Sequence, residues 1–141
     1  MQWIIGPLKQ YADFGGRASR SEFWAFLLFV TLLTVAAHYA DGTSGHDVTV
    51  AMNMGMIELS VTLLFLLPSI TIGVRRLHDS GKSGWWMMLV YLPWLATLAA
   101  GTNQALLIAS SGALLAGGIV WIILLLLPGD AEENAFGAPP A

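Results

Sequence analysis

The sequence predicts an all-α membrane protein, a bundle of four transmembrane helices with both termini in the cytoplasm. Composition is the first reason, because hydrophobic residues make up 56% of the 141 residues and charged residues only 11%. Soluble proteins contain about a quarter charged residues, and a chain of this size cannot bury so much apolar surface within itself. Lipid must therefore surround most of the chain. The second reason is that the six Lys and Arg residues fall in two short segments.

The N-terminal segment, residues 1–22, precedes the first long apolar run. Within it, MQWIIGPLKQY carries apolar residues at helical spacing with polar residues between them. This pattern predicts a short amphipathic segment at the cytoplasmic membrane surface, and a frayed terminus is the alternative. Ser19-Arg20-Ser21-Glu22 matches a capping box, which predicts that the first membrane helix begins there.

Four apolar runs are long enough to cross a membrane as helices. We expect them at about 23–39, 56–74, 84–100 and 105–127. At 1.5 Å per residue, runs of roughly 17–23 residues reach about 26–34 Å, which matches a hydrocarbon core of about 30 Å. The third run is short and contains Pro93. A re-entrant hairpin made of the last two runs is therefore the alternative to two full crossings.

The basic residues predict the orientation. Three precede the first helix and three lie between the second and third: Lys9, Arg17, Arg20, Arg75, Arg76 and Lys82. The connections on the other side, DGTSGHDVTV and GTNQ, contain no Lys or Arg. Because cytoplasmic loops retain basic residues, residues 1–141 should form a single membrane domain with four crossings. The tail 128–141 is rich in Pro and Gly, which predicts an irregular cytoplasmic end.

Three stretches of the chain resemble the motifs of a known family. They are GRASRSEFW before the first membrane helix, LPSITIGVRRLHDSGKSGWW across the second and third, and PGDAEENAFG after the fourth. These stretches resemble the DUF805 family, and the resemblance covers nearly the whole chain. It implies a small protein of the bacterial inner membrane with several membrane-spanning helices. The function of that family is not established, so the resemblance implies a class of protein and no reaction.

The loop HDSGKSG and its flanks form the candidate binding site. Gly- and Ser-rich backbone at a helix N-terminus, beside basic residues, suits an anion, and a lipid phosphate is the natural ligand at this depth. Flanking tryptophans would hold the loop at the interface. The candidate anion- and lipid-binding residues are Arg17, Arg20, Arg75, Arg76, His78, Asp79, Lys82, Trp85 and Trp86. The alternative is that these charges set the topology alone.

The same loop does not predict nucleotide binding. A P-loop needs a glycine five positions before Gly81 and a preceding strand, whereas this chain has Arg76 and a membrane helix. We therefore expect no nucleotide, no nucleic acid and no cofactor. His78 and Asp79 are neighbours in sequence and do not face one another on a helix. Asp79 is better placed to pair with Arg75 or Arg76, or to start the turn Asp-Ser-Gly, so we assign no catalytic residue.

No metal site is expected either. The chain has no cysteine, which excludes thiolate ligands and disulfides. Four possible ligands, His38, Asp41, His46 and Asp47, gather on the side opposite the basic residues. Their spacing is loose and their loop is Gly-rich, which is typical of a solvated loop.

Polar residues also follow one stripe of the second membrane helix: Glu58, Thr62, Ser69, Gly73 and Arg76. Such stripes face other helices. A solute or proton path would use Glu58 if an earlier helix start placed it about 10 Å inside that end. On the last helix, Ala109, Ala113 and Gly117 form a small-residue face suited to close packing or self-association.

These observations lead to one main functional hypothesis. We expect a non-catalytic module that binds anionic lipid or a membrane protein partner through RRLHDSGKSGWW, alone or as a homo-oligomer. The first alternative is a small channel or transporter subunit that uses the Glu58 stripe. The second is an enzyme that modifies lipid headgroups with His78 and Asp79.

Overall fold

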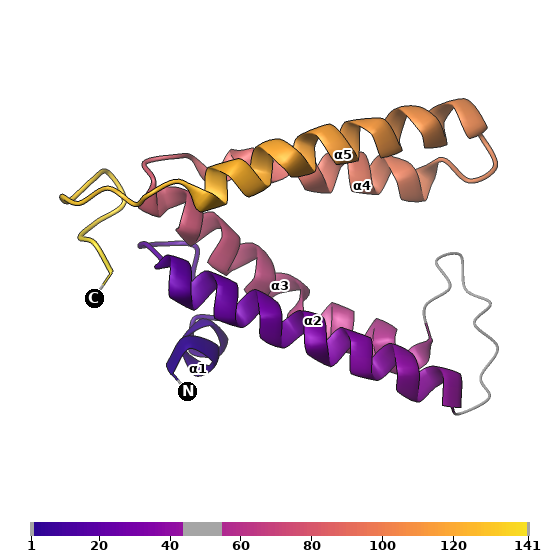
Figure 1. Ribbon diagram of the computed structural model, residues 1–141, viewed down its shortest axis with the longest axis horizontal. Helices are drawn as coiled ribbons and strands as arrows, with labels where there is room; N and C mark the ends of the chain where they lie inside the picture. The colour runs from indigo at the N-terminus through magenta and orange to yellow at the C-terminus, as the bar shows by residue number, and fades with distance from the viewer. Residues whose placement is uncertain (1, 44–54, 141) are drawn as a thin grey trace. The chain divides into compact units, whose positions relative to one another are not determined.

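The computed structural model describes residues 2–43 and 55–140 (Figure 1). Over these ranges the chain forms helices and no strand, which confirms the all-α prediction. The helices are α1 (Gln2–Lys9), α2 (Arg20–Thr43), α3 (Met56–Asp79), the 3-10 helix η1 (Gly84–Met87), α4 (Met88–Ala99) and α5 (Gln104–Leu126). They form two compact units: unit 1 is Met1–Asp13 with Ser21–Ile72, and unit 2 is Phe14–Arg20 with Gly73–Ala141. Helix α3 passes from the first unit into the second.

Unit 1 pairs α2 with the first part of α3. Phe26 and Phe29 of α2 contact Phe65 of α3, with ring centroids 6.4 and 5.8 Å apart. Helix α1 joins this pair through the segment that follows it, where the Tyr11 hydroxyl donates to the Leu64 carbonyl at 2.6 Å. The side of α2 that meets α3 is therefore aromatic.

Helix α2 is longer than the apolar run 23–39. It begins at Arg20, directly after the Ser19 of the capping box, and ends at Thr43. Hydropathy marks the apolar part of a helix, and polar turns can extend it at either end. At the far end the Asp41 carboxylate accepts from the N–H groups of Ile57 at 3.0 Å and Glu58 at 2.8 Å. This contact joins the last turn of α2 to the first turn of α3.

Unit 2 contains the hairpin formed by η1, α4 and α5. The run 84–100 divides into two helices, the 3-10 helix η1 and the α-helix α4. At the start of η1, the Ser83 side chain accepts from the Trp85 N–H. Short 3-10 turns are frequent at helix N-termini. Along the hairpin, the Thr97 hydroxyl donates to the Ser110 hydroxyl at 2.9 Å. Nearer η1, the Trp121 indole N–H donates to the Met87 sulfur at 3.2 Å.

A close contact between α4 and α5 joins the Leu89 carbonyl on one helix to Gly117 on the other. Pro93 has no N–H, so it cannot donate to the Leu89 carbonyl one turn earlier. This carbonyl faces Gly117 of α5, where a Cβ would overlap its oxygen. The small-residue face of α5 thus uses Gly117 for packing within the chain.

Within residues 2–43 and 55–140, three helices have the length and apolarity to cross a membrane: α2 over Arg20–Gly42, α3 over Met56–Asp79 and α5 over Gln104–Leu126. The run formed by η1 and α4 is apolar but shorter. Many large apolar side chains on these helices are exposed, among them Ile108 at 74% and Leu115 at 71%. A soluble protein rarely exposes such surface over whole helices, whereas lipid covers it.

Candidate functional site

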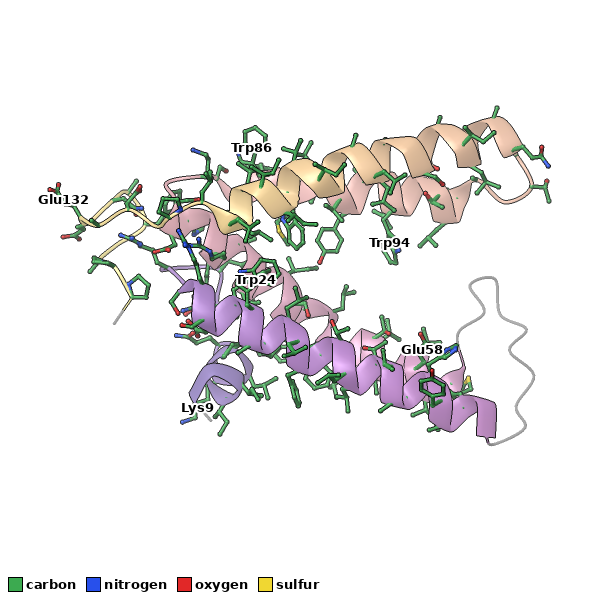
Figure 2. All side chains as sticks on the ribbon, in the orientation of Figure 1. Lys9, Trp24, Glu58, Trp86, Trp94 and Glu132 are labelled. Carbon is green, nitrogen blue, oxygen red and sulfur yellow. The ribbon has the colours of Figure 1, made fainter. Side chains whose placement is uncertain are left out.

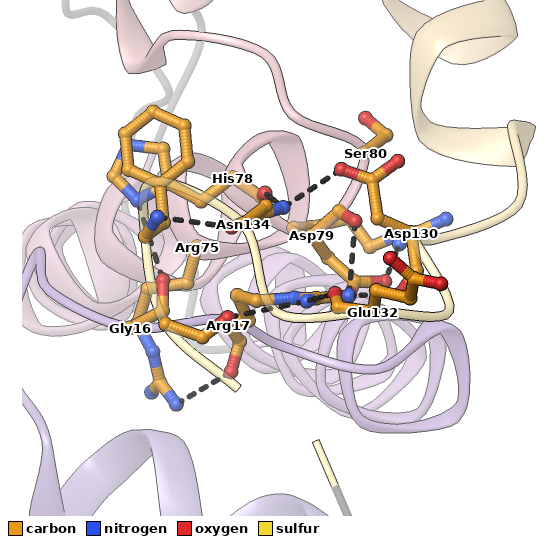
Figure 3. Close-up of polar contacts among 12 residues, drawn as sticks. Gly16, Arg17, Arg75, His78, Asp79, Ser80, Asp130, Glu132 and Asn134 are labelled. Atoms are coloured by element: carbon orange, nitrogen blue, oxygen red, sulfur yellow. Dashed lines mark hydrogen bonds and ion pairs between the residues drawn. The ribbon is translucent and has the colours of Figure 1, made fainter. Parts of the chain in front are cut away.

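The RRLHD motif lies at the end of α3, where unit 2 brings three segments together (Figure 3). These are residues 14–20, the last turns of α3 and the tail after α5. Arg17 lies at the centre, and its side chain is fully buried. Its Nε donates to Asp79 Oδ1 at 2.9 Å, and its Nη2 donates to the Asp79 carbonyl at 3.3 Å.

The other contacts of Arg17 are with the main chain of the tail. Its Nη1 donates to the carbonyls of Glu132 at 2.8 Å and Gly137 at 3.2 Å. Its Nη2 also donates to the Asp130 carbonyl. Together with Asp79, these acceptors account for all five N–H groups of the guanidinium. Arg17 therefore has no donor left for an external anion.

Arg76 binds the end of α5 and the same aspartate. Its side chain is fully buried, and its Nη1 donates to Asp79 Oδ2 at 2.5 Å. Its Nε donates to the Leu125 carbonyl at 3.1 Å, and its Nη2 donates to the Leu127 carbonyl. The last carbonyls of a helix lack helical donors, so Arg76 satisfies the C-terminus of α5. Asp79 consequently accepts one guanidinium on each carboxylate oxygen.

Arg75 joins the same arrangement through the main chain. Its Nη2 donates to the Arg17 carbonyl at 3.2 Å, and its own carbonyl accepts from the Ala18 N–H at 3.0 Å. Arg75 is buried, as are Arg76 and Asp79. The buried charges of the motif are thus arranged around one carboxylate and a set of carbonyls.

The tail packs closely against the end of α3. The Asp130 N–H donates to the Asp79 carbonyl at 2.8 Å, and a Cβ at Gly129 would overlap the Asp79 carboxylate. The Asn134 amide donates to the His78 carbonyl at 3.0 Å and to Asp130 Oδ2 at 2.8 Å. The Phe136 ring stacks on the His78 imidazole, with centroids 3.8 Å apart. The tail is irregular, and these contacts hold it in a defined place.

The remaining candidate residues lie around this cluster and are more exposed. Arg20 is exposed, and its Nε donates to the Leu127 carbonyl at 3.2 Å. Lys82 is half-buried in the loop before η1, and its side chain forms no ion pair with the residues that the structure describes. The side chains of Trp85 and Trp86 are 79% and 42% exposed.

Glu58 belongs to unit 1 and lies in the first turn of α3, which begins at Met56. Its carboxylate lies 2.8 Å from Nδ1 of His38. The structure therefore does not place Glu58 well inside the helix. Of the four possible metal ligands, His46 and Asp47 lie outside the described residues, and no group of three potential ligands occurs within them.

His78 and Asp79 do not form an acid–base pair. His78 stacks on Phe136, and its Nδ1 lies 3.3 Å from the Gly16 carbonyl. Both oxygens of Asp79 are occupied by arginines. The arrangement joins three segments of chain and leaves neither side chain in position to exchange a proton with the other.

Sequence reasoning did not identify the tail residues of this cluster. Asp130, Asn134 and Phe136 all lie in PGDAEENAFG, one of the stretches that carry the family resemblance. That resemblance was the available indication that the tail has a role. The pairing of Asp79 with Arg76 follows the spacing i, i+3, one of the two partners that the sequence left open.

With three apolar helices of membrane length in the described part of the chain, this is a multi-pass integral membrane protein. It belongs to the family described as "Protein of unknown function (DUF805)", whose pattern matches residues 11–138. It is 29% identical over 140 residues to the inner membrane protein YhaH of Escherichia coli (strain K12), covering 99% of this chain and 97% of YhaH.

A second relative of the same organism is the inner membrane protein YhaI. It is 30% identical over 98 residues, which cover 70% of this chain and 78% of YhaI. The uncharacterized protein YiiR is 29% identical over 130 residues, covering 90% of this chain and 70% of YiiR. No solved structure matches the chain. The predicted family and the location in the bacterial inner membrane are both confirmed.

Proposed function

We propose that this protein is a non-catalytic module that crosses the inner membrane four times, has both termini in the cytoplasm, and binds anionic lipid. The lipid phosphate contacts Lys82 and Arg20, and Trp85 and Trp86 lie at the interface beside it. One observation carries this proposal. The buried arginines of the motif are used within the chain, whereas Lys82 carries a positive charge without an ion pair among the described residues.

The lengths of the last two helices support four crossings. The rise of η1 and α4 together is about 26 Å, and that of α5 is about 34 Å, against a hydrocarbon core of about 30 Å. Contacts at Gly117 and at Ser110 show that α4 follows α5 along most of its length. A shallow re-entrant pair would not need helices of this length.

The position of the charges supports cytoplasmic termini. Arg17, Arg20 and Arg76 all contact the residues at or after the end of α5. The start of α2, the end of α3 and the end of α5 thus lie at one end of unit 2 with most of the basic residues. Basic residues are retained in the cytoplasm, so this end faces the cytoplasm.

Labelling of single cysteines tests the topology, and the chain has no cysteine of its own to interfere. Thr102→Cys, in the turn between α4 and α5, should react with an impermeant thiol reagent from the periplasm. Lys9→Cys and Glu133→Cys should react only after the cytoplasmic side is opened. Cytoplasmic labelling at Thr102 would show that α4 and α5 do not both cross.

Native mass spectrometry tests the lipid. We expect the purified protein to retain phosphatidylglycerol in preference to a zwitterionic phospholipid. Since one basic residue contributes about 1 kcal/mol to attraction by an anionic leaflet, Lys82→Gln should weaken phosphatidylglycerol binding about fivefold. Lys9→Gln, an exposed cation of α1, is the matched control. Equal binding in both variants would contradict the proposal.

No observation favours the other two hypotheses. A path through the membrane would need Glu58 inside the helix, and Glu58 lies in the first turn beside His38. Headgroup chemistry would need a free carboxylate or imidazole. Asp79 is occupied by two arginines, and His78 stacks on Phe136 with its Nδ1 directed at the Gly16 carbonyl.

A further inference from the structure

The hairpin of unit 2 has an apolar groove on its surface. Two adjoining cavities, of about 380 and 440 Å³, share Met88, Leu89 and Leu92 and form one continuous groove. The first cavity begins at Trp85 and Trp86, and the second continues between α4 and α5. All residues that line the two cavities are apolar.

Small residues of α5 line one side of the second cavity. Ala113, Ala116 and Gly117 form its side on α5, opposite Leu92 and Pro93 of α4. Gly117 lets the two backbones approach, since a Cβ there would overlap the Leu89 carbonyl oxygen. The second cavity therefore lies beside the close contact between the Leu89 carbonyl and Gly117 that joins the two helices.

One end of the groove is lined by Trp85 and Trp86, close in sequence to the basic residue Lys82. Trp86 projects from the side of the hairpin opposite Trp94 (Figure 2). Lys82 precedes η1 by two residues and forms no ion pair with a described residue. Indole rings concentrate at the level of the lipid headgroups. The apolar groove thus begins at two tryptophans that follow the cation Lys82 by three and four residues in the sequence.

We propose that this groove holds one acyl chain of an anionic phospholipid whose phosphate lies on Lys82. The inference rests on the proposed function, which places the lipid phosphate, and adds a binding site for the acyl chain. A phospholipid matches both parts at once, because its chain is linear and apolar and its head is negative at one end. A helix from a second copy would fill only the apolar part.

Substitutions that fill the groove test whether it binds the acyl chain of the lipid. Ala116→Leu places a larger side chain in the second cavity, and phosphatidylglycerol binding measured by native mass spectrometry should fall about fivefold or more. Gly118→Leu is the matched control, because nothing lies within 4 Å of a Cβ at this position. Leu92→Trp is a second filling variant. Leu92 lines both cavities and is 63% exposed, so its replacement leaves the packing between helices unchanged.

The outcomes separate the groove from the proposed function. Loss of binding in Lys82→Gln, Ala116→Leu and Leu92→Trp, with Gly118→Leu unchanged, is the expected result. Loss in Lys82→Gln alone would overturn the groove and leave headgroup binding in place. Unchanged binding in every variant would overturn both. A dimer mass that disappears in Ala116→Leu would identify a second copy as the occupant and would also overturn the inference.

Discussion

Arg17 and Asp79 form a buried ion pair between residues 62 positions apart in the sequence, with the Nη2 and Oδ1 atoms 2.9 Å apart. The pair joins the segment before α2 to the last residue of α3. Arg76 adds a second guanidinium to the same carboxylate, and both arginines extend to carbonyls at or after the end of α5. A single aspartate thus organises one end of unit 2.

Removal of one partner from this cluster should be strongly destabilising. Arg17→Ala leaves Oδ1 of Asp79 and three tail carbonyls without their arginine donor. Breaking a buried ion pair costs about 3–5 kcal/mol, because the remaining charge stays buried. We expect a loss of this size in the free energy of unfolding, measured by SDS titration in mixed micelles. Lys9→Ala, at an exposed cation, should change it by less than about 0.5 kcal/mol. Equal losses in the two variants would contradict the structural role of Arg17.

Asn134 should control how firmly the tail is held. Its amide bonds both the His78 carbonyl and Asp130 Oδ2. Because each such hydrogen bond contributes about 0.5–1.5 kcal/mol, Asn134→Ala should open the tail more often. A protease that cleaves after glutamate reports this opening at the exposed Glu132 and Glu133. Cleavage should be several-fold faster in Asn134→Ala than in the control Ala135→Ser, and equal rates would show that the tail is held by other contacts.

Replacement by alanine of the two neighbouring glycines of α5 should have different effects on the free energy of unfolding. A Cβ at Gly117 overlaps the Leu89 carbonyl, whereas a Cβ at Gly118 meets nothing within 4 Å. Gly117→Ala should therefore lower the free energy of unfolding by about 1–3 kcal/mol, the usual cost of overpacking. Gly118→Ala should leave it unchanged or raise it, since alanine has the higher helix propensity. The SDS titration measures both, and a tolerated Gly117→Ala would disprove the close contact between the helices.

The stability of the start of α3 should depend on how many acceptor oxygens the side chain at position 41 provides. Its two carboxylate oxygens accept from the N–H groups of Ile57 and Glu58. Loss of such a cap costs about 0.5–2 kcal/mol. We expect stability to fall in the order wild type, Asp41→Asn, Asp41→Ala, because asparagine retains one acceptor. Hydrogen exchange at the Ile57 and Glu58 amides should rise in the same order, and identical exchange in all three proteins would exclude the contact.

Several features of the fold could be predicted because they depend on properties of short stretches of chain. Apolar runs predicted α2, α3 and α5, and the capping box at Ser19 predicted the residue where α2 begins. The pairing of Arg76 with Asp79 was one of two partners suggested by helical spacing. The 3-10 turn at η1 was not predicted. It is accompanied by a hydrogen bond from the Trp85 N–H to Ser83, and hydropathy, which shows one continuous apolar run, does not report such a contact.

By itself the sequence determined the class of the protein: hydropathy and the RRLHD and tail motifs are local, and they establish a multi-pass inner-membrane protein of this family. Only the tertiary structure decided what the basic residues do. Arg17 bonds main-chain carbonyls of Asp130, Glu132 and Gly137, and every residue carries such a carbonyl. No pattern of side chains can mark those acceptors in advance. The fold therefore decided that Arg17 and Arg76 are internal, whereas Lys82 forms no ion pair with a described residue.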